Sequence, residues 1–171
     1  MRKTLFESFT HGPLTEPAPA PDEVGLAELA QSVNRAARAK LGRSLSIRQV
    51  DAGSCNGCEL EIHALGNAFY DLERLGLRFV ASPRHADVLM VTGPVTKNMS
   101  EALKRTYNAT PDPKWVVAVG ACAVDGGPFA GSYAVAGGVK DVVPVDLTIR
   151  GCPPNPRQLL AGLLALLRTA A

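Results

Sequence analysis

The chain contains the sequence WVVAVGAC from residue 115 to residue 122. Its first five residues are apolar and three of them are valine, which predicts a β-strand that is buried on both faces. Gly120, Ala121 and Cys122 follow directly. Because glycine permits the tight turn with which a strand ends, we expect Cys122 to lie in a loop at the carboxyl end of this strand.

The same order of strand, loop and helix continues on both sides of this sequence. Further strands are predicted at residues 47–50, 77–81, 86–91 and 142–145, and helices at residues 24–41, 59–75, 98–107 and 156–168. Glycines at 126–127 and 137–138 predict a flexible segment before the last strand. Apolar strands separated by helices indicate a doubly wound parallel sheet with helices on both faces, and therefore an α/β fold.

The first 44 residues differ from the rest. Residues 10–22 contain four prolines, a density that prevents helix formation and sheet pairing and predicts an extended arm. The helix at residues 24–41 has an apolar stripe with basic residues beside it, which suits packing on its own domain, on a partner protein or on an anionic membrane surface. We expect residues 1–44 to form this arm and helix, and residues 45–171 to form the sheet domain.

The composition is that of a globular protein. Of the 171 residues, 46% are hydrophobic and 20% are charged, and the net charge of +2 is too small to indicate nucleic-acid binding. No secretory signal and no apolar segment of the roughly 20 residues that span a bilayer are visible. We therefore expect a cytoplasmic chain, in which cysteines stay reduced and serve metal binding or redox chemistry rather than disulfides.

The four cysteines of the chain occupy three loops, and each loop follows a predicted strand. Cys55 and Cys58 come after the first strand, Cys122 after the strand at residues 115–119, and Cys152 after the last strand. Parallel strands place their carboxyl ends at one edge of a doubly wound sheet, so we expect the four thiols to meet there. Glycines beside every cysteine, and the proline after Cys152, favour an iron–sulfur cluster.

Three other uses of the cysteines stay open. A structural zinc site usually gathers two close pairs, whereas here one pair joins two single cysteines. A thiol–disulfide enzyme also suits Cys-x-x-Cys between a strand and a helix, but it leaves Cys122 and Cys152 without a role. Burial as small apolar residues conflicts with positions among glycines. The sequence has no phosphate-cradling glycine motif, so we do not expect flavin or nucleotide binding.

Five motifs within residues 45–167 resemble one protein family. They are Val50-Asp51-x-Gly53-Ser54-Cys55-Asn56-Gly57-Cys58-Glu59-x-Glu61, Ser82-Pro83-Arg84-His85-Ala86-Asp87, Val91-Thr92-Gly93-Pro94, Val119-Gly120-Ala121-Cys122-Ala123 and Gly151-Cys152-Pro153-Pro154. Through them the chain resembles the small subunit of energy-converting [NiFe] hydrogenases of the formate hydrogenlyase type. It is also similar to the twenty-kilodalton subunit of respiratory NADH:quinone oxidoreductase, complex I.

The resemblance implies a flavodoxin-like sheet and one proximal [4Fe–4S] cluster, with Cys55, Cys58, Cys122 and Cys152 as its ligands. It implies an electron-transfer subunit of an oxidoreductase complex that is not catalytic alone. The implied partners are a large subunit with a nickel–iron or quinone site, a ferredoxin-like iron–sulfur subunit and integral membrane subunits. The chain would then lie on the cytoplasmic face of the inner membrane, held there by these partners.

Two departures from the relatives bear on the choice between branches. Complex I members carry adjacent cysteines in the first motif, whereas this chain has Cys55-Asn56-Gly57-Cys58, which favours the hydrogenase branch. The equivalent subunit of a nickel-free, quinone-reducing complex is the alternative. Periplasmic uptake hydrogenases have a twin-arginine signal and a second cluster-bearing domain; neither is visible here, so we expect one cluster.

Six polar residues near the motifs are further candidates. Glu59, Glu61 and His63 are candidates for a proton relay or for the surroundings of the cluster, although an acidic residue in a first helical turn is also favourable to the helix dipole. Arg150 is a candidate to offset the charge of a cluster, although an arginine in a loop is often simply solvated. Arg84 and His85 are candidates for contact with the large subunit.

Overall fold

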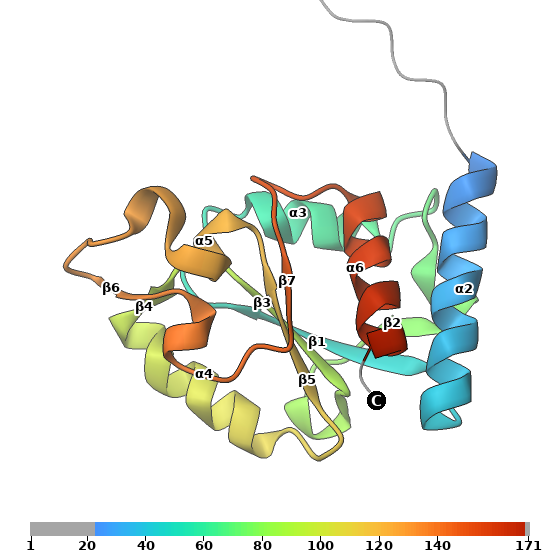
Figure 1. Ribbon diagram of the computed structural model, residues 1–171, viewed down its shortest axis with the longest axis horizontal. Coiled ribbons are helices and arrows are strands. Elements are labelled where there is room, and N and C mark those ends of the chain that lie inside the picture. Colours follow the sequence, from blue (N-terminus) through green and yellow to red (C-terminus); the bar gives the residue numbers. More distant parts are fainter. Residues whose placement is uncertain (1–22, 170–171) are drawn as a thin grey trace, which may run out of the picture.

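A five-stranded parallel sheet forms the centre of the molecule. The computed structural model describes residues 23–169, so the proline-rich arm expected within residues 10–22 lies outside the described residues. The sheet order is β2-β1-β3-β5-β7, and every neighbouring pair is parallel (Figure 1). The strands are β1 Leu45–Asp51, β2 Leu77–Phe79, β3 Val88–Thr92, β5 Trp115–Val119 and β7 Leu147–Ile149.

The strand order reverses between β1 and β3. From β1 the chain runs outward to β2, and it then returns to the other side of β1 to build β3, β5 and β7 in turn. Counting only parallel strands, this is the order 2-1-3-4-5 of flavodoxin-like folds, which confirms the expected fold class. Such sheets place ligands beyond the carboxyl ends of the strands at the point of reversal.

Helices cover both faces of the sheet. One face is covered by α2 Glu23–Leu41, α3 Gly57–Ala64 and α6 Pro156–Thr169, and the other by α4 Lys97–Ala109 and α5 Ala121–Asp125 (Figure 1). Ile62 and Leu163 meet Ile47 of β1 in the first core, whereas Leu103 and Val124 pack with the opposite face in the second. Every residue of β3 is buried, as the apolar sequence predicts for a central strand.

Helix α2 packs on its own domain, which confirms the first of the three surfaces considered for it. Ala30, Val33 and Ala37 are buried in the same core as β1, and α2 lies against α6. At its carboxyl end, the Lys40 ammonium lies 5.4 Å from the centroid of the Trp115 ring. This contact joins the end of α2 to the start of β5.

Two predicted elements differ in the structure. The helix expected at residues 59–75 ends at Ala64, and a turn leads to a short 3-10 helix, η1 Leu72–Leu75. The Asn67 side chain accepts hydrogen bonds from the Phe69 and Tyr70 N–H groups in that turn, which competes with continued helix. The last strand lies at β7, not at residues 142–145, because Val143 packs into the second core as part of a turn.

The glycine-rich segment after Cys122 contains regular structure that the sequence did not predict. It forms α5, then the 3-10 helix η3 Gly127–Phe129, then β6 Val135–Gly137 and the 3-10 helix η4 Val139–Asp141. Strand β6 pairs antiparallel with β4 Val95–Thr96. These strands are two and three residues long, too short for a periodic pattern to appear in the sequence.

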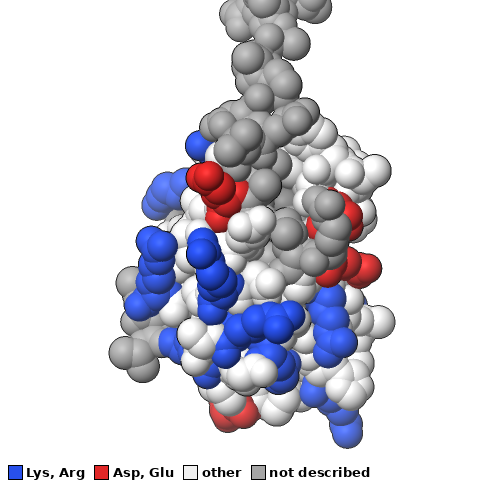
Figure 2. Space-filling model, turned by 90° about the vertical axis from the view of Figure 1, so that its right-hand side faces the viewer, with Lys and Arg blue, Asp and Glu red and all other residues white. Residues whose placement is uncertain are grey.

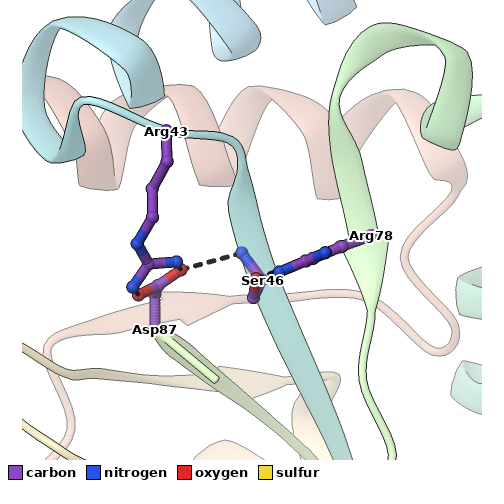
Figure 3. Close-up of polar contacts among 4 residues, drawn as sticks. All are labelled: Arg43, Ser46, Arg78 and Asp87. Atoms are coloured by element: carbon purple, nitrogen blue, oxygen red, sulfur yellow. Dashed lines mark hydrogen bonds and ion pairs between the residues drawn. The ribbon is translucent and has the colours of Figure 1, made fainter. Parts of the chain in front are cut away.

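A buried carboxylate holds the amino ends of three strands together (Figure 3). Asp87, just before β3, has a side chain that is only 2% exposed, and it forms a bidentate ion pair with the Arg43 guanidinium. It also accepts a hydrogen bond of 2.9 Å from the Ser46 N–H in β1. The Ser46 hydroxyl in turn accepts one from Arg78 Nε in β2, at 3.1 Å. Arg43, Ser46, Arg78 and Asp87 therefore fix the edge of the sheet at which the strands begin.

Candidate metal centre

The four cysteines lie in the loops at the opposite edge, where β1, β5 and β7 end. Cys55 precedes α3 and Cys58 stands in its first turn, while Cys122 stands in the first turn of α5. Cys152 lies between β7 and α6, ahead of the cis bond to Pro153. Cys55 and Cys152 are exposed, whereas Cys58 and Cys122 are partly buried.

Hydrogen bonds to side chains shape the first cysteine loop. The Asp51 carboxylate accepts bonds of 2.8 Å from the N–H groups of both Gly53 and Ser54, and the Ser54 hydroxyl accepts one from the Asn56 N–H at 3.1 Å. Asn56 then adopts a left-handed conformation with φ 71°, from which α3 starts. Asp51 therefore sets the path of the loop, a role that the sequence analysis missed. The Asp-x-Gly spacing, which is typical of such turns, was the available signal.

Backbone contacts between β5 and β7 bring the second and third loops together. The Gly120 N–H donates to the Ile149 carbonyl and the Ala121 N–H donates to the Gly151 carbonyl, both at 2.8 Å. The ladder between the two strands thus continues to the residues next to Cys122 and Cys152. These two cysteines, thirty residues apart in sequence, are held in adjoining loops.

Two glycines keep the space around the sulfur atoms open. A Cβ atom at Gly120 would lie 2.6 Å from Cys58 Sγ, and one at Gly127 would lie 2.9 Å from Cys122 Sγ. Both glycines have positive φ, 87° and 49°, which other residues rarely adopt. A side chain at either position would displace a cysteine sulfur.

The electrostatics of the loops oppose ionisation of the thiols. Burial, the Glu59 carboxylate and the other three cysteines raise the pKa of Cys58 to about 11. Burial, and then Cys152 and Cys55, also raise the pKa of Cys122. The cysteines are therefore near enough to repel one another as thiolates, and the site needs a compensating positive charge to hold them ionised.

The donor set fits an iron–sulfur cluster. Four thiols from three glycine-containing loops share one edge of the sheet, and iron ions would supply the positive charge that stabilises their ionised form. Within residues 23–169, no three His, Cys, Asp or Glu side chains are drawn together tightly enough to hold a single metal ion.

The structure places Glu59, Glu61 and His63 on α3 behind Cys58. Glu59 is 4% exposed, and neither of its carboxylate oxygens has a hydrogen-bond partner among residues 23–169. Glu61 is partly buried, and His63 is exposed at the rim of a cavity of about 380 Å³ that Arg48 and Phe79 also line. The burial of Glu59 could not be predicted, because it depends on the tertiary packing of α3, which lies against α6, and not on sequence spacing.

The three arginine and histidine candidates occupy two other places. Arg150 is exposed and forms an ion pair of 3.6 Å with Asp125, so it links the loop of Cys152 to the end of α5. Arg84 and His85 are both exposed in the 3-10 helix η2 Pro83–His85, which precedes β3. The Ser82 hydroxyl caps that turn by accepting a hydrogen bond from the Arg84 N–H.

Comparison with known proteins identifies the family of the chain. The sequence profile of the family described as NADH ubiquinone oxidoreductase, 20 Kd subunit, matches residues 55–166, a span that includes all four cysteines. The chain belongs to this family. The 20 kDa subunit family is the one that the five sequence motifs predicted, so the expected resemblance is confirmed.

Two relatives of the 20 kDa subunit family show the kind of complex in which it occurs. The chain is 46% identical over 131 residues to the probable membrane-bound hydrogenase subunit mbhJ of Pyrococcus furiosus, covering 77% of this chain and 78% of that protein. It also matches a chain in the structure of the membrane-bound sulfane sulfur reductase, an archaeal respiratory membrane complex, with TM-score 0.65 and 36% identity. That match covers 81% of this chain and 74% of the other. The relatives are subunits of oxidoreductase complexes, as the resemblance implied.

The described part of this chain, residues 23–169, contains no helix that is both long and apolar enough to cross a membrane.

Proposed function

We propose that this chain holds one [4Fe–4S] cluster on Cys55, Cys58, Cys122 and Cys152. We propose further that it is an electron-transfer subunit of a membrane-associated [NiFe]-hydrogenase-type complex. The observation that carries the proposal is the convergence of four cysteines from three loops at one edge of the sheet, where the other three raise the pKa of Cys58, and Cys152 and Cys55 raise the pKa of Cys122. When bound, the cluster supplies a one-electron redox centre.

The residues of the chain have distinct tasks in this proposal. The four thiolates bind iron, Asp51 sets the loop that carries the first pair, and Gly120 and Gly127 keep the sulfur atoms unobstructed. Two of the cysteines are exposed and two are partly buried, so one side of the site faces the protein and the other faces outward. The outward side is where a partner would exchange electrons with the chain.

The family and its two relatives support a proposal about the partners. We propose that the chain relays electrons between a ferredoxin-like iron–sulfur subunit and a large subunit with a nickel–iron site. We propose also that integral membrane subunits hold it on the cytoplasmic face of the inner membrane. Catalysis belongs to the large subunit. Arg84 and His85, both exposed, are proposed contacts with it.

The polar neighbours complete the proposal. Glu59, Glu61 and His63 are proposed to form a proton path or to adjust the surroundings of the cluster. Glu59 supports this through its burial without a hydrogen-bond partner within the described chain. Arg150, held by Asp125 near the loop of Cys152, is proposed to offset negative charge at the site.

A second candidate function is the equivalent subunit of a nickel-free, quinone-reducing complex. The family description, NADH ubiquinone oxidoreductase, favours it. The 46% identity to a membrane-bound hydrogenase subunit and the Cys55-Asn56-Gly57-Cys58 motif favour the hydrogenase type.

The deciding experiment is anaerobic purification of the native complex through a tag on this chain, followed by nickel and iron analysis. Stoichiometric nickel with hydrogen-dependent dye reduction supports the hydrogenase type. Iron without nickel assigns the chain to the quinone-reducing type.

The ligand set is tested in the same complex with Cys122→Ala. We expect the variant to lose or convert its cluster signal in electron paramagnetic resonance and to stop electron flow. Full iron content together with full activity in this variant would show that Cys122 is not a ligand.

A further inference from the structure

The edge of the sheet opposite the cysteines carries a cationic surface. Figure 2 looks at the side where the strands begin, and Lys and Arg side chains gather across its middle. We define the basic edge as the exposed residues Arg35, Arg38 and Lys40 of α2, Arg43 of the following loop, Arg78 of β2 and Arg168 of α6.

The fold explains why these residues gather. Helices α2 and α6 lie against each other and run in the same direction, so both end at the side where β1 begins (Figure 1). Arg38 and Lys40 stand in the last turn of α2, and Arg168 stands in the last turn of α6. Basic residues are favourable there because the carboxyl end of a helix carries partial negative charge. Packing the two helices side by side therefore concentrates positive charge at one edge.

Most of the side chains of the basic edge form no ion pair with a carboxylate among residues 23–169. Within residues 23–169, only Arg43 of the six forms an ion pair, and its side chain is still 54% exposed. Three of the others are held by neutral partners. Arg35 donates to the Ser32 hydroxyl, Arg38 Nε to the Asn34 side chain and Arg78 Nε to the Ser46 hydroxyl. These contacts fix the side chains without neutralising them. Apart from Arg43, the side chains of the basic edge thus keep their positive charge without an ion-pair partner among residues 23–169.

We propose that the basic edge binds the anionic phosphate headgroups of lipids at the membrane surface directly. Each Lys or Arg near such a surface adds to the attraction. None of the exposed large hydrophobic side chains of the described chain (Leu60, Phe69, Phe129 and Tyr133) lies on the basic edge. The association is therefore electrostatic, shallow and sensitive to salt, without insertion of apolar groups.

The contact with lipid sets the orientation of the chain. The cysteine loops lie at the other ends of the same strands, so they face away from the membrane when the basic edge rests on it. This inference rests on the proposed membrane association of the complex, but it does not depend on the identity of the cluster.

The test is sedimentation of the full-length, iron-loaded chain with lipid vesicles under anaerobic conditions. Vesicles of phosphatidylcholine alone are compared with vesicles that also contain phosphatidylglycerol. We expect binding only to the anionic vesicles, and loss of that binding at high salt. The variant Arg35→Gln/Arg38→Gln/Arg168→Gln should bind them about tenfold more weakly or worse.

A matched control removes the same number of positive charges elsewhere. Lys97, Lys104 and Lys140 are exposed and lie on the side of the sheet covered by α4 and α5, so Lys97→Gln/Lys104→Gln/Lys140→Gln should bind anionic vesicles as the unaltered chain does. Equal weakening in the two triple variants, or equal binding to both kinds of vesicle, would overturn the proposal.

Two further readouts separate the alternatives. If the basic-edge variant keeps vesicle binding but its purified complex lacks a protein subunit, the edge is a protein interface and the lipid proposal is wrong. Iron content is measured in every sample. A chain that binds anionic vesicles but never retains iron would contradict the proposed cluster and leave the lipid contact intact.

Discussion

Cys58 has the least favourable surroundings for a thiolate, because burial, Glu59 and three other cysteines all act against its ionisation. In cluster-free protein we therefore expect Cys58 to be alkylated slowly at neutral pH, with a rate that still rises as the pH approaches about 11. The exposed Cys55 is the internal comparison. Mass spectrometry of iodoacetamide-treated protein measures both rates, and a rate for Cys58 that levels off near neutral pH would contradict the expectation.

The raised pKa also has a consequence for stability. A Cys58 thiol that ionises near 9.0 when unfolded, but only at about 11 when folded, keeps its proton longer in the folded state. The cluster-free chain should therefore lose stability as the pH rises from 9.0 to about 11. The contribution of the protonated Cys58 thiol to the free energy of unfolding is fully present below pH 9.0 and is lost across that window. Urea unfolding at a series of pH values between 9.0 and about 11 measures this fall in the free energy of unfolding.

Gly120 permits a test of the space around the sulfurs. In Gly120→Ala, the new Cβ would lie 2.6 Å from Cys58 Sγ, so we expect a marked loss of bound iron. Gly131→Ala is a matched control, because Gly131 has a similar φ of 78° and nothing within 4 Å of the added carbon. Both variants should lose about 1 kcal/mol or more of stability from backbone strain. Equal iron content in the two would show that Gly120 does not shape the site.

At the scale of elements, the Asp87 network joins the starts of β1, β2 and β3. In Asp87→Asn, the Arg43 guanidinium would lose its ionic partner, and the Ser46 N–H would keep at most a weaker acceptor. We expect a loss of about 2–3 kcal/mol, below the usual figure for a fully buried pair because Arg43 is half exposed.

Chemical denaturation measures this loss, and Asp112→Asn is the control. Asp112 is 83% exposed and lies 3.7 Å from Lys114, an arrangement that contributes little to stability. A free energy of unfolding that falls no further in Asp87→Asn than in the control would exclude a structural role for the network.

The elements show what the sequence predicts and why it stops there. The strands at residues 88–92 and 115–119 were predictable because buried parallel strands are continuous apolar runs. The loop of Cys122 follows the second of these runs, whereas Cys152 follows β7, whose short sequence LTI was not predicted as a strand. The valines at 142–143 form a similar run, but there the apolar side chains serve a turn that packs into the core. The end of α3 depends on side-chain bonds of Asn67, and the β4–β6 pair on contacts between distant residues. Neither the end of α3 nor the β4–β6 pair can be predicted from the local sequence pattern.

At the scale of the whole molecule, the two cores and the central strands should unfold together, while the periphery opens locally. Strands β3 and β5 are almost completely buried between the helical layers, whereas no residue of β6 is fully buried. We expect amide hydrogens of β3 and β5 to exchange only through global unfolding, and those of β6 to exchange orders of magnitude faster. Hydrogen exchange followed by mass spectrometry distinguishes the two segments. Protection of β6 equal to that of β5 would mean that the glycine-rich segment belongs to the same cooperative unit.

The parallel strands also separate the cysteine loops from the cationic side chains of the basic edge. Each five-residue central strand spans about 17 Å, and it separates the cysteine loops at one end from the cationic side chains at the other. The packed aliphatic core between them contains no redox-active side chain in β3, whose sequence is VLMVT. The central strands therefore offer no redox-active side chain along β3 between the two ends of the sheet. We expect an electron held at the cysteine loops to enter and leave on the side of those loops rather than along the strands.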